Sequence, residues 1–414
     1  MVASHIITRR RFLHSIASAS AALVGVPLTA PLSAMTVAQP QSVHLPFENG
    51  YRELVAYPQK RPLIVITSRP PQLETPFSVF NEGLITPNDA FFVRYHWAGI
   101  PTSIDPATFR LKVGGKVNRP LELSLDDLKQ LADQVSLVAV LQCSGNSRGF
   151  FEPRVSGGQM ANGAMGNALW TGIPLKKVLE KAGVQKGAMQ VSFAGLDRSL
   201  FPNGPAFVKA LSIEHALERE VMLAWAMNGE DLPVLNGYPL RLVVPGYYGT
   251  YWIKHVSEIT VLDAPFKGFW MDPAYRIPDN ACACVPAGEV PGKTIPISKL
   301  NVRSFIVNLT DDSTVTAGKE NIVRGIAFDQ GYGISEVIFS SDGGHSWQAA
   351  KLGEDMGRYA FREWSIPFVP TKKGQYQLKV RAINRIGQTQ PMTALWNPSG
   401  YMRNVVETKN VMAR

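Results

Sequence analysis

Apolar and polar residues alternate with a period of two in the C-terminal part of the chain. Between residues 375 and 382 every second residue is apolar, and Gln, Lys or Arg stands between them, which is the pattern of a strand with one buried face. A second strand is expected at 334–339, because residues 341–344 (SDGG) behind it form a typical hairpin turn. Trp347 follows this turn and is a candidate for the core. Since residues 300–400 contain strand and turn signals only, we predict an all-β immunoglobulin-like sandwich over 297–408.

Helix signals are interspersed with apolar stretches in the first part of the chain. Ser124 is a candidate N-cap, because an acidic residue, Asp127, lies three positions after it and Leu125 and Leu128 begin an apolar face. Further short helices are expected at 173–179 and 213–217, and strands at 135–141, 191–194, 240–244 and 253–262. We therefore predict a mixed α+β domain over 39–290, which ends near the proline-containing stretch 286–296.

The N-terminal 38 residues have the character of an export signal. Residues 8–14 (TRRRFLH) precede an apolar run of small residues at 16–30, an order typical of secretory signals. The Arg9-Arg10 pair resembles a twin-arginine signal, which exports folded proteins. An amphipathic first helix is the alternative, and Pro27 and Pro31 argue against it. We expect cleavage after Ala34 or Ala38, and a periplasmic protein that folds before export because it takes up a cofactor.

Composition and charge exclude several classes of protein. The 414 residues, 45% of them hydrophobic and 18% charged, suffice for two globular domains. The net charge of +9 falls to +6 without residues 1–38, whose only charged side chains are three arginines (9 − 3 = 6). No dense Lys/Arg run with interleaved aromatic residues indicates a nucleic-acid partner, and no apolar stretch beyond the signal is long enough for a membrane span. A small anion is the more natural partner.

The chain has only three cysteines, Cys143, Cys282 and Cys284. That number excludes a disulfide framework. Cys282 and Cys284 are one residue apart, too close for an unstrained disulfide, so we expect two structural thiols. No Cys-x-x-Cys-His sequence is present, so we expect no haem in this chain.

Cys143 stands where a predicted buried strand meets a polar loop (residues 144–151, SGNSRGFF). Chemistry often lies at such a junction, because the strand fixes the position of the side chain. The nearby Arg148 favours a thiolate, which suits metal ligation or nucleophilic attack. The alternative is a buried cysteine that packs as a small apolar residue.

Two further stretches carry candidate binding residues. Arg94 and His96 are two positions apart and lie on one side if the chain is extended. Residues 236–254 place Arg241 and Lys254 around a strand and a glycine turn, an arrangement suited to a phosphate. The alternative in both cases is a set of solvated surface charges.

Together, the three stretches resemble the sulfite oxidase family of molybdenum enzymes, most of all the catalytic subunits of bacterial periplasmic sulfite dehydrogenases. The resemblance covers nearly all of the chain after residue 45. It implies a sulfite-oxidase-type domain with one molybdenum-molybdopterin cofactor, followed by the immunoglobulin-like domain. It also implies oxidation of sulfite to sulfate and transfer of the electrons to a c-type cytochrome. We expect a heterodimer with a small cytochrome subunit; a homodimer is the alternative.

The resemblance also assigns roles to individual residues. Cys143 would be the protein ligand of molybdenum, and the substrate pocket would contain Arg94, His96, Arg148 and Tyr275. The residues expected to contact the cofactor are Arg94, Tyr95, His96, Cys143, Asp197, Asn236, Arg241, Trp252, Ile253 and Lys254. The chain departs from the animal members of the family at three positions. Those members have His and Val where this chain has Trp252 and Ile253, and we expect them to have Arg where it has Tyr251.

Two other functions fit parts of the sequence. A related exported molybdenum enzyme could reduce a sulfoxide or nitrate, although the arginine-rich pocket favours sulfite. An exported binding protein without a cofactor could be built around the C-terminal domain, but it would leave the folded-export signal and the Cys143 loop unexplained.

Overall fold

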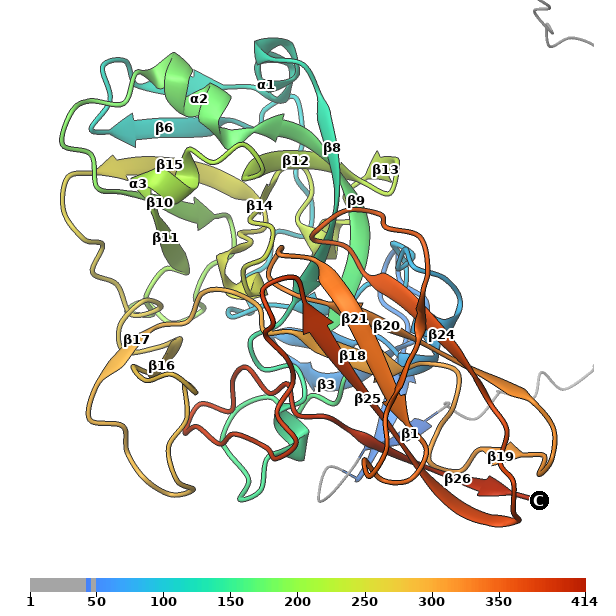
Figure 1. Cartoon of the computed structure of the whole chain (residues 1–414). Coiled ribbons are helices and arrows are strands. Elements are labelled where there is room, and N and C mark those ends of the chain that lie inside the picture. Colours follow the sequence, from blue (N-terminus) through green and yellow to red (C-terminus); the bar gives the residue numbers. More distant parts are fainter. Residues whose placement is uncertain (1–41, 46–49) are drawn as a thin grey trace, which may run out of the picture. The chain divides into compact units, whose positions relative to one another are not determined.

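Most of the regular structure in residues 42–45 and 50–414, which the computed structural model describes, consists of strands in six sheets (Figure 1). The expected export signal at 1–38 lies outside the described residues. The first sheet has the order β1-β2-β3-β4-β5. Its strands are Ser42–Leu45, Gly50–Val55, Leu63–Ser68, Pro71–Glu74 and Val93–Arg94. The pairing of β4 with β5 sets Gln72 opposite Arg94 and thereby fixes the position of that arginine.

A second sheet carries the predicted strand that leads to Cys143. Its order is β13-β12-β9-β8, and β14 also pairs with β12. The strands are β8 (Val135–Gln142), β9 (Met165–Pro174), β12 (Met222–Met227), β13 (Glu230–Asp231) and β14 (Arg241–Val243). An unbroken antiparallel ladder joins β8 to β9 from Val135 to Gln142. Cys143 therefore follows a rigid strand, as predicted from the sequence.

The third sheet has the order β11-β10-β15-β6-β7, with β15 parallel to β6. Its strands are β6 (Leu111–Gly115), β7 (Leu121–Leu123), β10 (Gln190–Gly195), β11 (Val208–Ser212) and β15 (Val256–Leu262). A short ribbon of β16 (Arg276–Pro278) and β17 (Thr294–Pro296) follows it in the chain. The mixture of sheets with short helices agrees with the expected sulfite-oxidase-type domain, although helices contribute less than an α+β class suggests.

Three short α-helices accompany these sheets: α1 (Leu125–Leu131), α2 (Leu175–Ala182) and α3 (Ile213–Ala216). The Ser124 side chain accepts from the Asp127 backbone N–H, and the Asp127 carboxylate accepts from the Ser124 N–H, which confirms the predicted start of α1. Helix α2 begins later than predicted, because Ile173 and Pro174 complete β9. Among the helices that the structure describes, none has the length and apolar character needed to cross a bilayer.

Residues 297–414 contain strands but no helix, as the sequence predicted for this region. One sheet has the order β18-β20-β24-β23 and the other the order β19-β26-β25-β21-β22. The strands are β18 (Arg303–Ile306), β19 (Thr314–Val315), β20 (Asn321–Phe328), β21 (Ile334–Ser340), β22 (Gln348–Ala349), β23 (Lys351–Leu352), β24 (Arg362–Phe368), β25 (Gly374–Asn384) and β26 (Thr408–Ala413). Both sheets contribute to one core. Its description as immunoglobulin-like stays a prediction.

The alternation in β25 has the predicted sense, because Leu378, Val380 and Ala382 are buried. The prediction for Trp347 was wrong. Its indole lies in the β21-β22 hairpin, is only half-buried and donates to the Gly344 carbonyl at 3.0 Å. The tryptophan in the core is Trp364 on β24, which is fully buried.

The main core extends from the first three sheets into the C-terminal region. Phe305, Phe328 and Phe361 belong to the same cluster of buried residues as the apolar faces of β8, β9 and β12. The Val140 backbone N–H also donates to the Tyr359 carbonyl at 2.9 Å. The described residues, 42–45 and 50–414, accordingly form one compact unit. The boundary predicted near 286–296 is not visible as a gap in the packing and stays a prediction.

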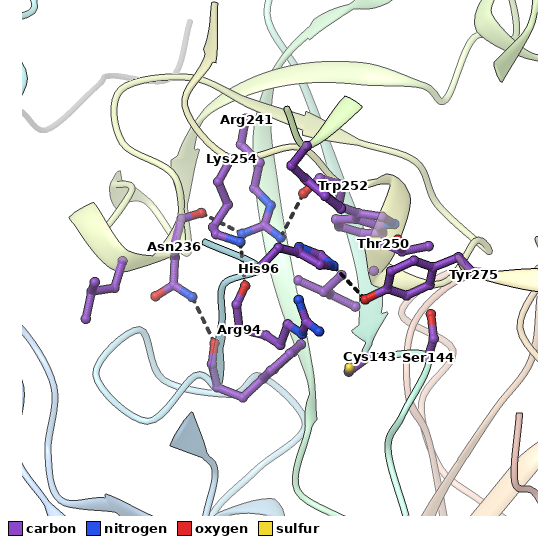
Figure 2. Close-up of a pocket in the computed structure, with 15 residues that line it drawn as sticks. Arg94, His96, Cys143, Ser144, Asn236, Arg241, Thr250, Trp252, Lys254 and Tyr275 are labelled. Carbon is purple, nitrogen blue, oxygen red and sulfur yellow. Dashed lines mark hydrogen bonds between the residues drawn. The ribbon is translucent and has the colours of Figure 1, made fainter. Parts of the chain in front are cut away.

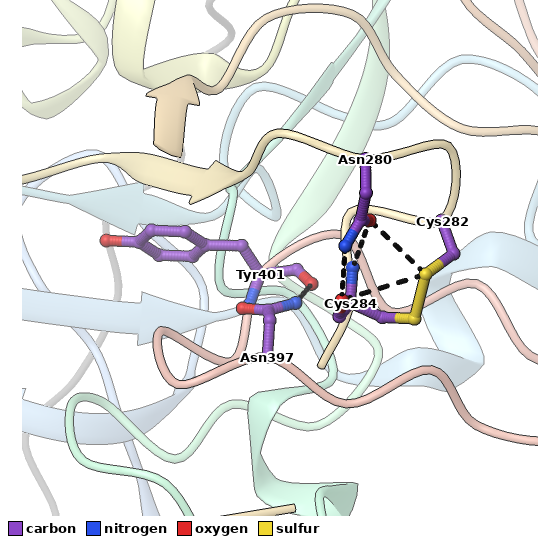
Figure 3. The surroundings of a disulfide bond; sticks show 5 residues. All are labelled: Asn280, Cys282, Cys284, Asn397 and Tyr401. Carbon is purple, nitrogen blue, oxygen red and sulfur yellow. Dashed lines mark hydrogen bonds between the residues drawn. A yellow bond between two sulfur atoms is a disulfide. The ribbon is translucent and has the colours of Figure 1, made fainter. Parts of the chain in front are cut away.

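The structure joins Cys282 and Cys284 in a disulfide (Figure 3), so the prediction of two free thiols was wrong. The two Cα atoms are 5.1 Å apart, which is an ordinary separation for a disulfide. The chain makes this possible by turning at Ala283, whose φ is +50°. Asn280 holds the turn, since its amide donates to the Cys284 carbonyl at 2.8 Å and its carbonyl oxygen accepts from the Cys284 N–H at 3.2 Å.

Candidate functional site

One pocket brings together residues from several distant segments (Figure 2). Its cavity volume is about 40 Å³. Its walls come from β5, the end of β8, the segment before β11, the 3-10 turns η4 (Val234–Asn236) and η5 (Gly249–Tyr251), and β14. The lining residues are Phe92, Arg94, His96, Leu141, Cys143, Ser144, Phe207, Leu235, Asn236, Arg241, Gly249, Thr250, Trp252, Lys254 and Tyr275.

Cys143 presents the one thiol of the pocket. It is free and half-buried, and it follows β8 directly. Its backbone N–H donates to the Ala164 carbonyl at 2.9 Å, which fixes the loop that begins here. Gly249 allows η5 to approach this strand end, because a Cβ at position 249 would lie 2.8 Å from the Leu141 side chain and 3.1 Å from the Gln142 carbonyl oxygen. A thiol held in this way is available as a soft metal ligand.

Arg94 and His96 face the pocket from the same side of an extended segment, and Tyr95 between them points away from it. The Tyr95 hydroxyl donates to His255 Nε2 at 2.7 Å, and the His255 Nδ1–H donates to the Tyr238 carbonyl. The Arg94 backbone carbonyl accepts from Lys254 Nζ at 2.7 Å. Arg94 Nη1 is buried without a partner among the described residues, which leaves it free for a bound group.

His96 lies in an aromatic enclosure formed by Phe207, Trp270 and Tyr275, which we call the histidine box. Its ring stacks on Phe207 with a centroid distance of 3.6 Å and meets Trp270 edge-on at 4.7 Å. Nε2 shares a hydrogen bond with the Tyr275 hydroxyl. Burial lowers the pKa of His96 well below its usual value, and the nearby positive charges of Arg94, Lys254 and Lys209 lower it further. His96 is therefore neutral at physiological pH.

Arg241 and Lys254 form the positive part of the opposite wall. Arg241 is buried, donates to the carbonyls of Asn236 at 2.6 Å and Trp252 at 3.4 Å, and lies against the ring of Trp170. Its Nε atom has no partner in the described chain. Burial lowers the pKa of Arg241 to about 9. Burial also lowers the pKa of Lys254 to about 7, an effect that Arg241 reinforces.

Asn236 reaches the pocket, but its side chain is already engaged. Its Oδ1 accepts from Lys60 Nζ at 2.5 Å and its Nδ2 donates to the Phe92 carbonyl at 3.1 Å. Lys60 is buried and donates also to the carbonyls of Asn88 and Phe91. Burial lowers the pKa of Lys60 to about 7. No local pattern indicated a role for this lysine, which lies 176 positions before Asn236.

The structure places Arg148 behind the wall of the pocket, whereas we expected it beside the substrate. Its guanidinium donates to the carbonyls of Ser399 at 3.1 Å and Gly158 at 3.4 Å and lies over the ring of Tyr401. Tyr401 in turn stacks on Tyr275 with a centroid distance of 5.3 Å. Tyr401 and Tyr275 thus link Arg148 to the pocket.

Three residues expected at the cofactor do not line the pocket: Tyr95, Asp197 and Ile253. Ile253 is buried, and its carbonyl accepts from the Leu242 N–H at 2.9 Å. Asp197 follows β10 in a partly buried position. Burial raises the pKa of Asp197, and the positive charge of Lys254 opposes this effect. Asp197 therefore influences the pocket through its charge rather than by contact.

Sequence reasoning missed several residues of the pocket. Ser144 and Thr250 both line it with buried hydroxyl groups that lack a partner in the described part of the chain. Their positions next to Cys143 and within the 236–254 stretch were the only signals that could have found them. Phe207 and Leu235 carry no polar group, and their role as wall residues follows only from the fold.

The pocket is suited to an anionic ligand that carries a metal ion. Three cationic side chains line the pocket, and among the described residues none of them forms an ion pair with a carboxylate. Unpartnered donors at Arg94, Arg241, Ser144 and Thr250 face or flank the same space. Buried donors of this kind are costly unless a bound group satisfies them. In the described chain no three His, Cys, Asp or Glu side chains gather as metal ligands, so Cys143 is the candidate ligand here.

Two family models match the chain. Residues 97–270 match the oxidoreductase molybdopterin binding domain, and residues 294–412 match the Mo-co oxidoreductase dimerisation domain. A crystal structure of the sulfane dehydrogenase SoxCD from Paracoccus pantotrophus shares the fold, with a TM-score of 0.71 and 24% identity over 86% of this chain and 87% of that one.

The curated relatives include sulfite oxidases and a nitrate reductase. Human mitochondrial sulfite oxidase is 34% identical over 84% of this chain, but the match spans only 65% of the human protein. Sulfite oxidase of Gallus gallus is 31% identical over 83% of this chain and 77% of its own length. An NADH nitrate reductase of Hordeum vulgare is 30% identical over 83% of this chain, although the match covers only 40% of that enzyme.

The buried His255 predicts a specific dependence of stability on pH. Burial lowers the pKa of His255 from 6.5 to about 3, so below pH 6.5 the unfolded chain binds a proton that the folded chain does not. Stability is therefore lost as the pH falls from 6.5 towards 3. Between pH 7 and pH 5 this one group should cost about 2 kcal/mol.

The His255→Asn variant removes the titrating group and tolerates the positive φ of 50° at this position. We expect it to be less stable than the wild type at pH 7 but to lose less free energy of unfolding between pH 7 and pH 5. Urea unfolding at both pH values measures this, and parallel losses in the two proteins would refute the assignment.

Proposed function

Because the chain belongs to the sulfite oxidase family of molybdenum enzymes, we propose that it oxidises sulfite to sulfate at a molybdenum-molybdopterin centre in this pocket. The observation that carries the proposal is one pocket with a free thiol, three cations and several buried donors, where the cations have no ion pair and the donors no partner among the described residues. The two domain-level matches and the sulfite oxidase relatives support it.

The residues present fit the cofactor. Cys143 would ligate the metal, because a soft thiolate suits molybdenum. Arg241 and Lys254 would hold the phosphate end, and the Thr250 hydroxyl and Arg241 Nε, which lack partners among the described residues, would supply further donors. Trp252 would form an apolar wall, with its indole N–H already donating to the Tyr247 carbonyl at 3.1 Å. When bound, the cofactor supplies the two-electron oxidation and the oxygen transfer.

The chain itself would bind and orient sulfite. Arg94 would contact an oxyanion through Nη1, which has no partner in the part of the chain that the structure describes. Burial raises the pKa of Tyr275, so its hydroxyl keeps its proton and can donate to the same anion. In this arrangement the neutral His96 donates its Nε2–H to the hydroxyl oxygen, which leaves the Tyr275 proton for the anion. Arg148 would act from behind by holding the 399–401 segment that carries Tyr401.

Replacement of Cys143 tests the proposal. In the Cys143→Ser variant we expect sulfite oxidation to fall at least about 100-fold, because loss of outer partners of a metal ligand alone costs 10–100-fold. The wild type should contain one molybdenum per chain. In the variant the molybdenum content should fall less than the activity, since Arg241 and Lys254 would still hold the cofactor. Metal analysis and sulfite-dependent reduction of cytochrome c measure both quantities.

The Cys282→Ser/Cys284→Ser double variant is the control, and it should retain metal and activity because this disulfide does not line the pocket. Well-folded wild type without molybdenum would refute the proposal. Nitrate reduction without sulfite oxidation would instead favour the reductase function that the barley relative suggests.

We propose a c-type cytochrome as the electron acceptor. Aromatic contacts lead from the pocket to the surface, since His96 meets Trp270 at 4.7 Å and Trp270 meets Phe269 at 5.0 Å between ring centroids. Phe269 is 45% exposed and could contact a partner. The cytochrome could be a bound subunit, as in the expected heterodimer. The match over 294–412 to a dimerisation domain suggests a homodimer instead, and light scattering distinguishes the two.

A Phe269→Ser variant should reduce cytochrome c more slowly, by about tenfold if the ring is a contact in the interface. Its rate with ferricyanide, a small acceptor that needs no protein contact, should stay unchanged. Tyr51→Ser provides a matched exposed aromatic, because Tyr51 is 76% exposed on β2. Equal rates of cytochrome reduction in both variants would count against Phe269 as the site where electrons leave the protein.

We also propose export to the periplasm by the twin-arginine route, on the basis of Arg9 and Arg10. Replacing both by Lys keeps the charge but removes the recognised pair. We expect the variant to accumulate in the cytoplasm with its N-terminal segment intact, as judged by cell fractionation and mass spectrometry. Unchanged periplasmic recovery would argue for another route.

A further inference from the structure

Lys209 is a buried cation that the function proposed above does not use. It lies on β11, where it is paired with Phe193 of β10, and its exposed fraction is 0%. Among the described residues no carboxylate forms an ion pair with it; its Nζ donates to the Trp270 carbonyl at 2.6 Å. An ammonium group without a counter-ion is costly to bury, and burial lowers the pKa of Lys209 to about 7.

The contacts of Lys209 are with aromatic groups around the pocket. Its Nζ lies 4.7 Å from the ring centroid of Tyr251 and 5.0 Å from that of Tyr275. Such distances are typical of cation–π attraction. Tyr251 is itself fixed, because its hydroxyl donates to the Ile297 carbonyl.

Two members of the histidine box contact Lys209, and the third precedes it closely in the chain. Trp270 accepts its hydrogen bond, Tyr275 lies under its charge, and Phe207 precedes it by two residues in the chain. These are the side chains that enclose His96, which shares its hydrogen bond with the Tyr275 hydroxyl. One ammonium group therefore links the Trp270 backbone to the Tyr275 ring from outside the pocket.

We propose that Lys209 is a positioning residue for an oxyanion substrate, which holds Tyr275 and the histidine box in place and adds positive charge beside the pocket. The proposal rests on the proposed function only in taking sulfite as the substrate and sulfate as the product. An anion in the pocket favours the ammonium form of Lys209, and by linkage that form favours the anion.

The charge and the hydrogen bond of Lys209 can be tested separately. Lys209→Gln keeps a donor for the Trp270 carbonyl but removes the charge, and Lys209→Arg keeps the charge. Lys112→Gln on the surface of β6 is the control, because Lys112 is exposed. For each molybdenum-loaded protein we would measure KM and kcat for sulfite, the calorimetric Kd for sulfate, the thermal unfolding midpoint and the metal content.

In Lys209→Gln we expect KM for sulfite and Kd for sulfate to rise together by at least roughly tenfold, which is the effect of one pair of unit charges about 10 Å apart at an effective dielectric of ~20. The value of kcat should change less, and Lys209→Arg should restore both constants. If Lys209→Gln does not fold, Lys209→Met replaces it, and Lys209→Arg again serves as the variant that should bind the anions as the wild type does.

Anion binding as in the wild type in Lys209→Gln, or a defect that Lys209→Arg does not rescue, would overturn the proposal. A wild type that binds sulfate but does not oxidise sulfite would instead overturn the proposed function, and the sulfate Kd values would still decide the role of Lys209.

Discussion

Burial of positive charge without paired carboxylates is the constraint on which this site depends. The pocket is lined by Arg94, Arg241 and Lys254. Two further lysines contact residues that line it: Lys60 binds Asn236, and Lys209 lies against Tyr275. In the described chain their partners are carbonyl groups, an amide and aromatic rings rather than acids. Burial of these unpaired charges lowers the stability of the folded chain, and a bound anion offsets that cost. Both the cofactor phosphate and the oxyanion substrate of the proposed function meet this requirement.

The rigidity of the cysteine loop comes partly from the far end of the chain. The guanidinium of Arg303 on β18 is buried and donates to the Ser147 hydroxyl at 2.6 Å and to the Glu407 carboxylate at 3.0 Å. Glu407 also accepts from Asn162 at 2.7 Å. The C-terminal region therefore holds the loop after Cys143 from outside, while the β8-β9 ladder holds it from within. A cysteine held from both sides is suited to the role of metal ligand that we propose for it.

Local signals in the sequence predicted helices and strands. Packing between distant segments decided where several charged side chains lie in the site. The capping box at Ser124, the alternation in β25 and the strand that ends before Cys143 are each encoded within a few residues. The positions of Lys60 and Lys209 depend on segments far away in the chain, so their roles had no local pattern. Arg148 was assigned by resemblance, but the carbonyls of Gly158 and Ser399 draw it behind the pocket.

The central claim is that Cys143 ligates molybdenum in this pocket, and X-ray absorption at the molybdenum edge tests it most directly. The measurement compares purified wild type with Cys143→Ser. We predict that the metal in the wild type has one sulfur ligand more than the metal in the variant. The same number of sulfur ligands in both proteins would contradict the account, because the thiol of Cys143 would then lie outside the coordination sphere.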